Sequence, residues 1–425
     1  MNTQIFTEIE SNVRSYCRAF PAVFTKAKGS ILYAEPGQEY IDFFSGAGTL
    51  NYGHNNDYLK QELIEYLSAD FMTHGLDLYT SAKRAFLTEF NQHILKPRGL
   101  DYKVQFCGPT GTNAVEAALK LARKVKGRPG IFAFMGGFHG MTLGSLAATG
   151  NKYNRAGAGV PLNHVTFMPY PHGFMASFDT IEYIETVLSD SNSGIEKPAA
   201  MLLETTQAEG GIIVAPSEWL RRLKALCEKH DILLICDDIQ TGCGRTGTFF
   251  SFERAGIEPD IVLLSKSISG YGLPFALVLH KPELDVWQPG EHNGTFRGHQ
   301  LAFVTGAAAL ARYWSNNDFE NEVKQKESYL HTFMANEIQP LSPALQIRGV
   351  GLIWGIDLSG LGNPNLAKKV ANRCFASGLV IERAGRDDQV IKFLPPLTIE
   401  PALLKKGCEI VRKALADTLE EAGIY

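Results

Sequence analysis

The sequence contains little cysteine, and none of it has metal-binding or redox spacing. Its 425 residues include seven cysteines, an odd number at low density, and no two of them form a Cys-x-x-Cys pair. That pair marks most zinc ribbons and thioredoxin-type sites, so we expect neither, and no metal site is predicted. This cysteine usage fits a reducing compartment.

Long apolar runs and blocks of one charge are also missing. No apolar stretch approaches the roughly 20 residues of a membrane-spanning helix, and Met1–Phe6 lacks the basic start and apolar run of a signal peptide. The 41 basic and 45 acidic residues give a formal net charge of −4, without the basic surface that nucleic-acid binding requires. We therefore expect a cytoplasmic protein that binds small molecules, with no membrane or nucleic acid among its partners.

The middle of the chain alternates short apolar runs with an amphipathic segment. The spacing predicts strands at Ile131–Phe134, Ala199–Leu203, Asp231–Cys236 and Ile261–Leu264, and a helix at Ser217–Lys229. Runs that are apolar on both faces and are separated by helices indicate a parallel sheet covered on both sides. The predicted fold class is therefore α/β.

The two ends of the chain have a different pattern. Strands are predicted at Val350–Leu358 and Val390–Leu394, with helices at Asn365–Ser377 and Ala402–Leu419. This order is typical of a small α+β domain. The expected division is an N-terminal segment packing with the small domain, a large domain and a C-terminal small domain: residues 1–50, 51–310 and 311–425.

A glycine-rich turn precedes a strong helical pattern. Gly108–Asn113 leads into an alanine- and leucine-rich stretch that Gly127 can terminate. The free N–H groups at Gly111 and Thr112 offer a site for an anion such as phosphate. The alternative is an ordinary helix start with threonine as the capping residue, which is the commoner case when the turn is taken alone.

Charged residues follow two of the predicted strands. Asp237 and Asp238 end one of them, at the sheet edge where ligands of open parallel sheets bind. A carboxylate there could serve as a metal ligand, a base or a partner for a ring nitrogen, or could cap the next turn. Lys266 follows Ile261–Leu264, and a desolvated lysine is a usable amine nucleophile. The alternative is a lysine that reaches the surface at a strand end.

Together these features match the needs of one cofactor. A phosphate cradle, a carboxylate for a ring nitrogen and a lysine for a Schiff base are the three parts that pyridoxal 5′-phosphate requires. At this point the chain resembles the class III aminotransferases over nearly its whole length. The resemblance is carried by Asp237–Gly247 (DDIQTGCGRTG), followed by Asp260 and Lys266, with Asp-Asp where the class has Asp-Glu.

The resemblance implies a fold and a set of site residues. The fold is the type I pyridoxal-phosphate transferase fold, with a mostly parallel seven-stranded sheet in the large domain and a small α+β domain. Lys266 and Asp237 are expected to be catalytic. The cofactor-binding residues implied are Gly111, Thr112, Phe138, His139, Asp237, Ile239, Gln240 and Lys266, with Thr295 supplied by the neighbouring subunit. The last residue implies a homodimer with shared active sites and leaves a higher oligomer open.

Within the class, the chain most resembles the subgroup that acts on L-2,4-diaminobutyrate and 2-oxoglutarate in ectoine biosynthesis. Gly46–His54 (GAGTLNYGH), Gly108–Leu119 (GPTGTNAVEAAL) and Asn293–Ala302 (NGTFRGHQLA) carry this likeness. The implied products are L-aspartate 4-semialdehyde and L-glutamate. A donor of the 4-aminobutyrate, ornithine or acetylornithine type remains an alternative, as do an aminomutase, a decarboxylase and a non-catalytic binding protein.

Four residues are expected to bind substrate. Glu209 matches a class glutamate that pairs with an arginine, but Lys392 stands at the arginine position and offers a point charge in place of a planar fork. Lys392→Ala is therefore expected to raise the KM for glutamate more than that for diaminobutyrate. Arg297 and Glu204 complete the predicted set. Met141 replaces an arginine of ornithine-type members and argues against ornithine as the substrate.

Overall fold

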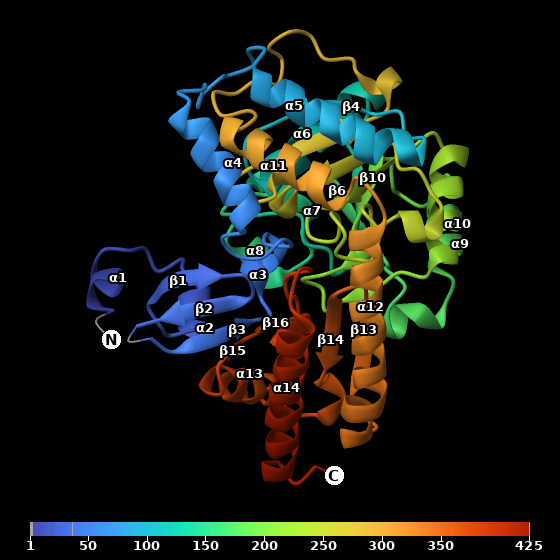
Figure 1. Cartoon of the computed structure of the whole chain (residues 1–425). Coiled ribbons are helices and arrows are strands. Elements are labelled where there is room, and N and C mark those ends of the chain that lie inside the picture. Colours follow the sequence, from blue (N-terminus) through green and yellow to red (C-terminus); the bar gives the residue numbers. More distant parts are fainter. Residues whose placement is uncertain (1–2, 36, 425) are drawn as a thin grey trace.

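A seven-stranded sheet forms the centre of the computed structural model, which describes residues 3–35 and 37–424 (Figure 1). In spatial order its strands are β4 (Lys103–Phe106), β12 (Leu277–His280), β11 (Ile261–Leu264), β10 (Leu233–Asp237), β7 (Ala200–Leu203), β5 (Ile131–Phe134) and β6 (Val165–Met168). Only β12 runs antiparallel to its neighbours. The predicted α/β class with a mostly parallel sheet is confirmed.

The middle of this sheet is buried on both faces because strands such as β5, β7 and β11 are apolar throughout, whereas the edge strands β4 and β6 are partly exposed. Ile131 and Ala133 of β5 pack in the core beneath α6 (Gly111–Lys126). The alternate residues Phe132 and Phe134 pack on the opposite face, against α9 (Thr180–Ser189) and α10 (Ser217–Lys229). Near β12 and β4 the second face is covered by α5 (Ser81–Phe90) and α11 (Gln300–Tyr313), which lie side by side (Figure 1).

The N-terminal strands share a sheet with a strand near the C-terminus. This sheet has the order β1 (Phe24–Lys28), β2 (Ile31–Ala34), β3 (Glu39–Asp42) and β15 (Leu379–Val380), and β3 pairs with β15 in parallel. Segments some 340 residues apart thereby lie together, in the lower part of Figure 1. The domain limits given above stay a prediction.

A second four-stranded sheet lies in the C-terminal part of the chain. Its order is β13 (Gln346–Val350), β14 (Ile353–Asp357), β17 (Val390–Phe393) and β16 (Glu382–Ala384). The strand predicted over Val350–Leu358 is β14, but it begins later, because Gly351 adopts a φ of +56° and turns the chain between β13 and β14. The antiparallel pairing of β16 and β17 sets Glu382 opposite Lys392.

The remaining elements surround these sheets. They are α1 (Gln4–Glu8), α2 (Tyr16–Ala19), α3 (Ser45–Gly48), α4 (Asp57–Ser68), α7 (Leu143–Ala148), α8 (Lys152–Ala156), β8 (Thr206–Gln207), β9 (Ile213–Val214), α12 (Asp318–Phe333), α13 (Leu366–Ala376) and α14 (Pro401–Glu421). Within residues 3–35 and 37–424, no helix has both the length and the apolar character needed to cross a bilayer.

Candidate active site

Lys266 lies directly after β11, at the carboxyl edge of the central sheet. Its backbone adopts a φ of +50°, a strained conformation for a residue with a side chain. The Nζ atom donates a hydrogen bond of 2.8 Å to the carbonyl of Ala47, in the short α3 segment. Burial lowers the pKa of the Lys266 ammonium to about 8, against the opposing charge of Glu209. The structure thus holds a desolvated amine at the predicted position.

Asp237 ends the neighbouring strand β10 and has a buried carboxylate. Its Oδ2 atom lies 2.7 Å from Nδ1 of His139, and its Oδ1 atom accepts the backbone N–H of Ile239 at 3.2 Å. The His139 side chain is fully buried. Burial opposes charge on this imidazole, but the hydrogen bond and charge of Asp237 raise the pKa of His139 above its usual value. The pair fixes the direction in which Asp237 points.

Glu204 contacts the backbone of the loop that carries Phe138 and His139. Its two oxygens accept backbone N–H groups of Phe138, at 2.9 Å, and of Ala208, at 3.0 Å. Burial raises the pKa of this carboxyl to about 7. These contacts make Glu204 a support for the loop that carries Phe138, and they do not favour the substrate-binding place expected from the sequence.

The N-terminus of α6 approaches the loop that follows β10. Asn113 accepts the backbone N–H of Thr110 at 3.3 Å and the hydroxyl of Thr110 at 2.7 Å, so capping is shared between these two side chains. A Cβ atom added at Gly111 would lie 3.1 Å from a methyl group of Ile239. The hydroxyl of Thr112 lies 2.8 Å from that of Ser145. The helix start therefore lies beside the Asp237 loop, as the predicted cradle requires.

Lys392 is enclosed by two carboxylates. Its Nζ atom lies 2.6 Å from Glu209 and 2.7 Å from Glu382, and its side chain is fully buried. Although burial disfavours a charged lysine, Glu209 and Glu382 together raise the pKa of Lys392. Burial likewise disfavours the Glu209 carboxylate, but Lys392 and Lys266 lower the pKa of Glu209 below its usual value. Glu382 is therefore a site residue that the sequence did not reveal.

Gln240 connects this cluster to the Asp237 loop. Its amide nitrogen donates to Glu209 at 3.1 Å. Its Oε1 atom is buried and has no donor among the described residues. An acceptor of this kind suits a ligand hydroxyl.

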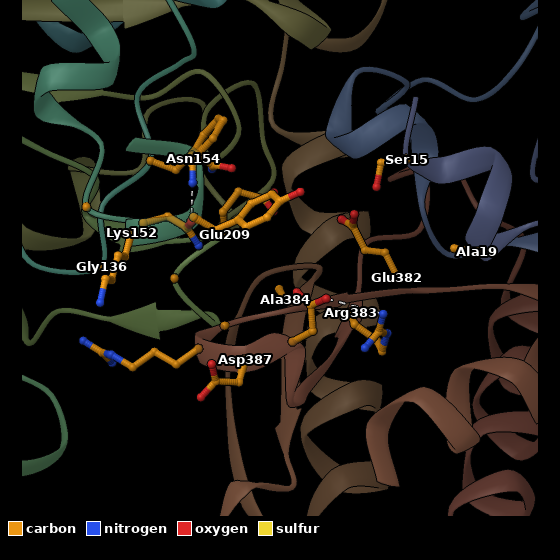
Figure 2. A pocket seen from close by; sticks show the side chains of 18 of the residues that line it. Ser15, Ala19, Gly136, Lys152, Asn154, Glu209, Glu382, Arg383, Ala384 and Asp387 are labelled. Carbon is orange, nitrogen blue, oxygen red and sulfur yellow. Dashed lines mark hydrogen bonds and ion pairs between the residues drawn. The ribbon is translucent and has the colours of Figure 1, made fainter. Parts of the chain in front are cut away.

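A cleft of about 1380 Å³ opens beside these residues. It is lined by Tyr16 of α2, by Phe138 and Met141 from the central sheet's loops, and by Glu209 and Glu382. Figure 2 shows Glu209 on the side of the central sheet and Glu382 on the side of the C-terminal part. Phe138 and Glu209, which pairs with the buried Lys392, both line this cleft.

Thr295 and Arg297 lie outside this cleft. Thr295 is exposed, and Arg297 donates from Nε to the carbonyl of Phe106 at 3.3 Å. The segment that carries them packs on a neighbouring loop, where the Phe296 ring lies 5.4 Å from the His74 ring and Arg297 pairs with Asp77 at 3.7 Å. Within one chain these two residues do not join the predicted site.

Three charged residues, Asp238 and Arg245 in the loop after β10 and Asp260 before β11, have structural contacts. Asp238 accepts the Thr241 hydroxyl at 2.8 Å and the Ser251 N–H at 2.9 Å, which fits the turn-capping alternative. Asp260 accepts the Leu234 N–H at 2.8 Å. Arg245 is fully buried and donates to the carbonyl groups of Leu352, at 2.9 Å, and Pro395, at 2.6 Å, and to Oδ1 of Asn51, at 2.6 Å, so it ties three parts of the chain together.

A family model for class III aminotransferases matches residues 14–415. Curated relatives named diaminobutyrate–2-oxoglutarate transaminase are similar over nearly the whole chain. The protein from Bordetella parapertussis is 56% identical, covering 99% of this chain and 97% of the relative. Those from Streptomyces coelicolor, 55% identical over 97% and 98%, and Vibrio parahaemolyticus, 56% identical over 97% and 97%, are similar to the same degree.

Solved structures of transaminases have the same fold. The ornithine aminotransferase of Toxoplasma gondii, described with partial occupancy of PLP at its active site, superposes with a TM-score of 0.85 at 25% identity, covering 98% of this chain and 94% of that one. An S-selective transaminase from Arthrobacter sp. superposes with a TM-score of 0.87 at 22% identity, covering 98% and 96%. The second likeness concerns the fold alone.

Proposed function

The chain belongs to the class III aminotransferases, and from this premise we propose that it transfers an amino group between L-2,4-diaminobutyrate and 2-oxoglutarate. The products are L-aspartate 4-semialdehyde and L-glutamate. The observation that carries the proposal is the buried amine of Lys266, whose charge interacts with Glu209, the cleft-lining partner of Lys392. The names of relatives at 55 and 56% identity support the choice of donor.

The enzyme uses pyridoxal 5′-phosphate, as its family does. The residues present fit this group: Lys266 offers an amine, Asp237 offers a buried carboxylate, and the start of α6 offers N–H groups beside them. The unpartnered Oε1 atom of Gln240 adds an acceptor for the ring hydroxyl. We assign Phe138 and Ile239 to the two ring faces, and Gly111, Thr112 and the partner subunit's Thr295 to the phosphate.

Each residue of the site then has a defined task. When bound, the cofactor supplies an aldehyde that takes up the donor's amine and a ring that accepts the electrons of the broken carbon–hydrogen bond. Lys266, whose amine pKa is lowered by burial to about 8, takes the proton from the amine-bearing carbon. Asp237, oriented by His139, stabilises a proton on the ring nitrogen. Lys392 provides the positive charge for the carboxylate of glutamate.

A homodimer with shared sites is part of the proposal. An apolar patch at residues 71–79 is exposed in the single chain. Its members, with their exposed fractions, are Phe71 (51%), Met72 (46%), Leu76 (48%), Leu78 (55%) and Tyr79 (102%). The segment that carries Thr295 packs on the same stretch of chain, through Phe296 on His74 and Arg297 with Asp77. A second copy that covers the patch brings Thr295 to a neighbouring subunit.

The proposal also includes a compartment and a pathway. Seven unpaired cysteines, six of them buried, support the reducing compartment expected from the sequence, and we place the enzyme in the cytoplasm. Ectoine biosynthesis is the proposed pathway. In the cell the reaction then runs in the reverse direction, with glutamate donating the amino group to L-aspartate 4-semialdehyde.

A donor panel tests the proposal. Purified protein with added cofactor is mixed with 2-oxoglutarate and, separately, with L-2,4-diaminobutyrate, ornithine, 4-aminobutyrate and N-acetylornithine, and glutamate is measured. The highest kcat/KM is expected with diaminobutyrate. A higher value with another donor keeps the aminotransferase activity and replaces the substrate. Glutamate from none of them contradicts the proposed function.

A further inference from the structure

Within direct contact, the Lys392 cluster (Lys392, Glu209 and Glu382) holds two carboxylates and one ammonium group, and the charge of Lys266 acts on both carboxylates from farther away. Glu209 and Glu382 both contact Nζ of Lys392, and no other cation contacts either carboxylate among the described residues. Burial raises the pKa of Glu382 to about 7, to which the negative charge of Glu209 also contributes. Two buried carboxylates with one lysine are stabilised by a further cation.

The two carboxylates also face the place where a donor must lie. Glu209 and Glu382 line the cleft, whereas the Lys392 side chain has no exposed surface. The Oε1 atom of Glu382 lies 2.7 Å from Nζ of Lys392 and is buried, and no described residue donates a well-oriented hydrogen bond to it. Figure 2 shows Glu382 and Glu209 on opposite sides of the cleft. The exposed charge at this point of the cleft is therefore negative.

Resting on the proposed function, we propose that Glu382 binds the ammonium group of the donor that is not transferred. L-2,4-Diaminobutyrate carries two ammonium groups, and 4-aminobutyrate is the same molecule without the second one. An ammonium held between Glu382 and Glu209 gives the cluster two positive and two negative groups. Glu382 thereby selects diamino acids over ω-amino acids with a single amine, which makes it a specificity-determining residue.

The test compares the binding of L-2,4-diaminobutyrate and of 4-aminobutyrate to the wild-type holoenzyme and to its Glu382→Gln variant. This substitution keeps the size of the side chain and removes its charge. The KM for diaminobutyrate is measured together with the inhibition constant of 4-aminobutyrate, which needs no turnover. We expect the KM for diaminobutyrate to rise by about 10- to 100-fold, the value of one charged hydrogen bond. The inhibition constant of 4-aminobutyrate should change by less than about threefold, because no charged contact is lost.

Two further variants separate recognition from general effects. Asp388→Asn removes the same charge from the rim of this cleft, where the Asp388 side chain is 61% exposed and pairs with Arg383, and it should leave both constants unchanged. Glu382→Asp keeps the charge and should recover part of the diaminobutyrate affinity. Thermal unfolding of all three variants checks that they are folded.

A purely structural role of Glu382 has a different signature. If Glu382 only positions Lys392, Glu382→Gln weakens the binding of 2-oxoglutarate, whereas the proposal expects its KM to stay the same or fall, since a negative charge is removed. Equal changes for both amines, or no change for diaminobutyrate, overturn the proposal. If the wild-type enzyme does not turn over diaminobutyrate, the proposed function fails, and the inhibition constants of the two amines against the true donor still decide the role of Glu382.

Discussion

At the scale of single residues, Lys392 is separated from the cleft by the carboxylates that it neutralises. Its side chain is fully buried, and Glu209 must move away before a substrate carboxylate can take its place. Lys392→Ala leaves two carboxylates without a cation, which repel the dianion 2-oxoglutarate and attract an ammonium group. We expect the KM values for 2-oxoglutarate and glutamate to rise by about tenfold or more and that for diaminobutyrate to change much less.

Steady-state kinetics of both half-reactions measure this difference. Lys392→Arg is the matched control, because it keeps the charge and restores the fork that the class commonly has at this position. Its KM for glutamate should stay close to that of the wild type. Equal increases for glutamate and diaminobutyrate in Lys392→Ala would contradict the role given to Lys392.

The protonation of Glu382 gives the donor preference a pH dependence. Burial raises the pKa of Glu382 to about 7, and the charged groups that face it are Lys392, Glu209 and Lys266. Only the ionised form binds an ammonium group, so the KM for diaminobutyrate should rise as the pH falls below about 7, by about tenfold per unit at lower pH.

The ratio of the diaminobutyrate KM to the 4-aminobutyrate inhibition constant isolates this effect. The pKa of Lys266 is lowered to about 8. Its protonation affects both constants alike, so its contribution cancels in the ratio. Measurements between pH 6 and 8.5 in wild type and Glu382→Gln check the prediction. A ratio that stays constant in the wild type, or that keeps its slope in the variant, assigns the dependence to another group.

The sequence predicted those site residues that stand directly at the end of a strand. Lys266 and Asp237 stand where β11 and β10 stop, and an apolar run followed by a charge is visible in the sequence. Glu382 was missed because its importance comes from the pairing of β16 with β17, which no local pattern reveals. The sequence did not show that two backbone N–H groups contact the Glu204 carboxylate, whose contact with substrate stays a prediction.

At the scale of elements, the predictions were most accurate for parallel strands buried on both faces, whereas the antiparallel β12, also buried throughout, was not predicted. Ile131–Phe134 and Ile261–Leu264 have the predicted bounds, and Ser217–Lys229 is the predicted helix. They failed where a strand is half-exposed and short: β1 has mainly exposed side chains and was not predicted. The parallel pairing of β3 with β15 also has no local signal, since it joins distant parts of the chain.

The junction between the Phe138 loop and α6 depends on Gly140. This glycine has a φ of +124°, and a Cβ atom added there would lie 2.5 Å from the hydroxyl oxygen of Thr112. Gly140→Ala therefore pushes the loop away from the start of α6. We expect a loss of cofactor affinity of about tenfold or more, with destabilisation of about 1–3 kcal/mol.

Spectroscopic titration with the cofactor and thermal unfolding measure the two effects. Gly159→Ala is the matched control, because Gly159 has a φ of +69° and nothing within 4 Å of an added Cβ. It tests backbone strain without a steric clash and should leave cofactor affinity unchanged. Equal losses in both variants would mean that strain alone, and not the contact with Thr112, explains the result.

At the scale of the whole molecule, Thr295 lies outside the cleft of the single chain, and an apolar patch at residues 71–79 is uncovered. Tyr79 makes the clearest test of the proposed dimer, because its side chain is 102% exposed and its replacement removes little that stabilises the monomer. Tyr79→Glu introduces a charge into the patch that the second copy is proposed to cover. Burying that unpaired charge costs several kcal/mol at each of two symmetric positions.

Light scattering should find twice the chain mass of 46.7 kDa for the wild type and a shift towards the single-chain mass for Tyr79→Glu on dilution. Cofactor affinity should fall with dissociation, because the partner's contribution to the phosphate is lost. Tyr183→Glu on α9, where the side chain is 45% exposed on another face, should keep both mass and affinity. A wild-type monomer with full activity would remove Thr295 from the site and leave the patch without its proposed partner.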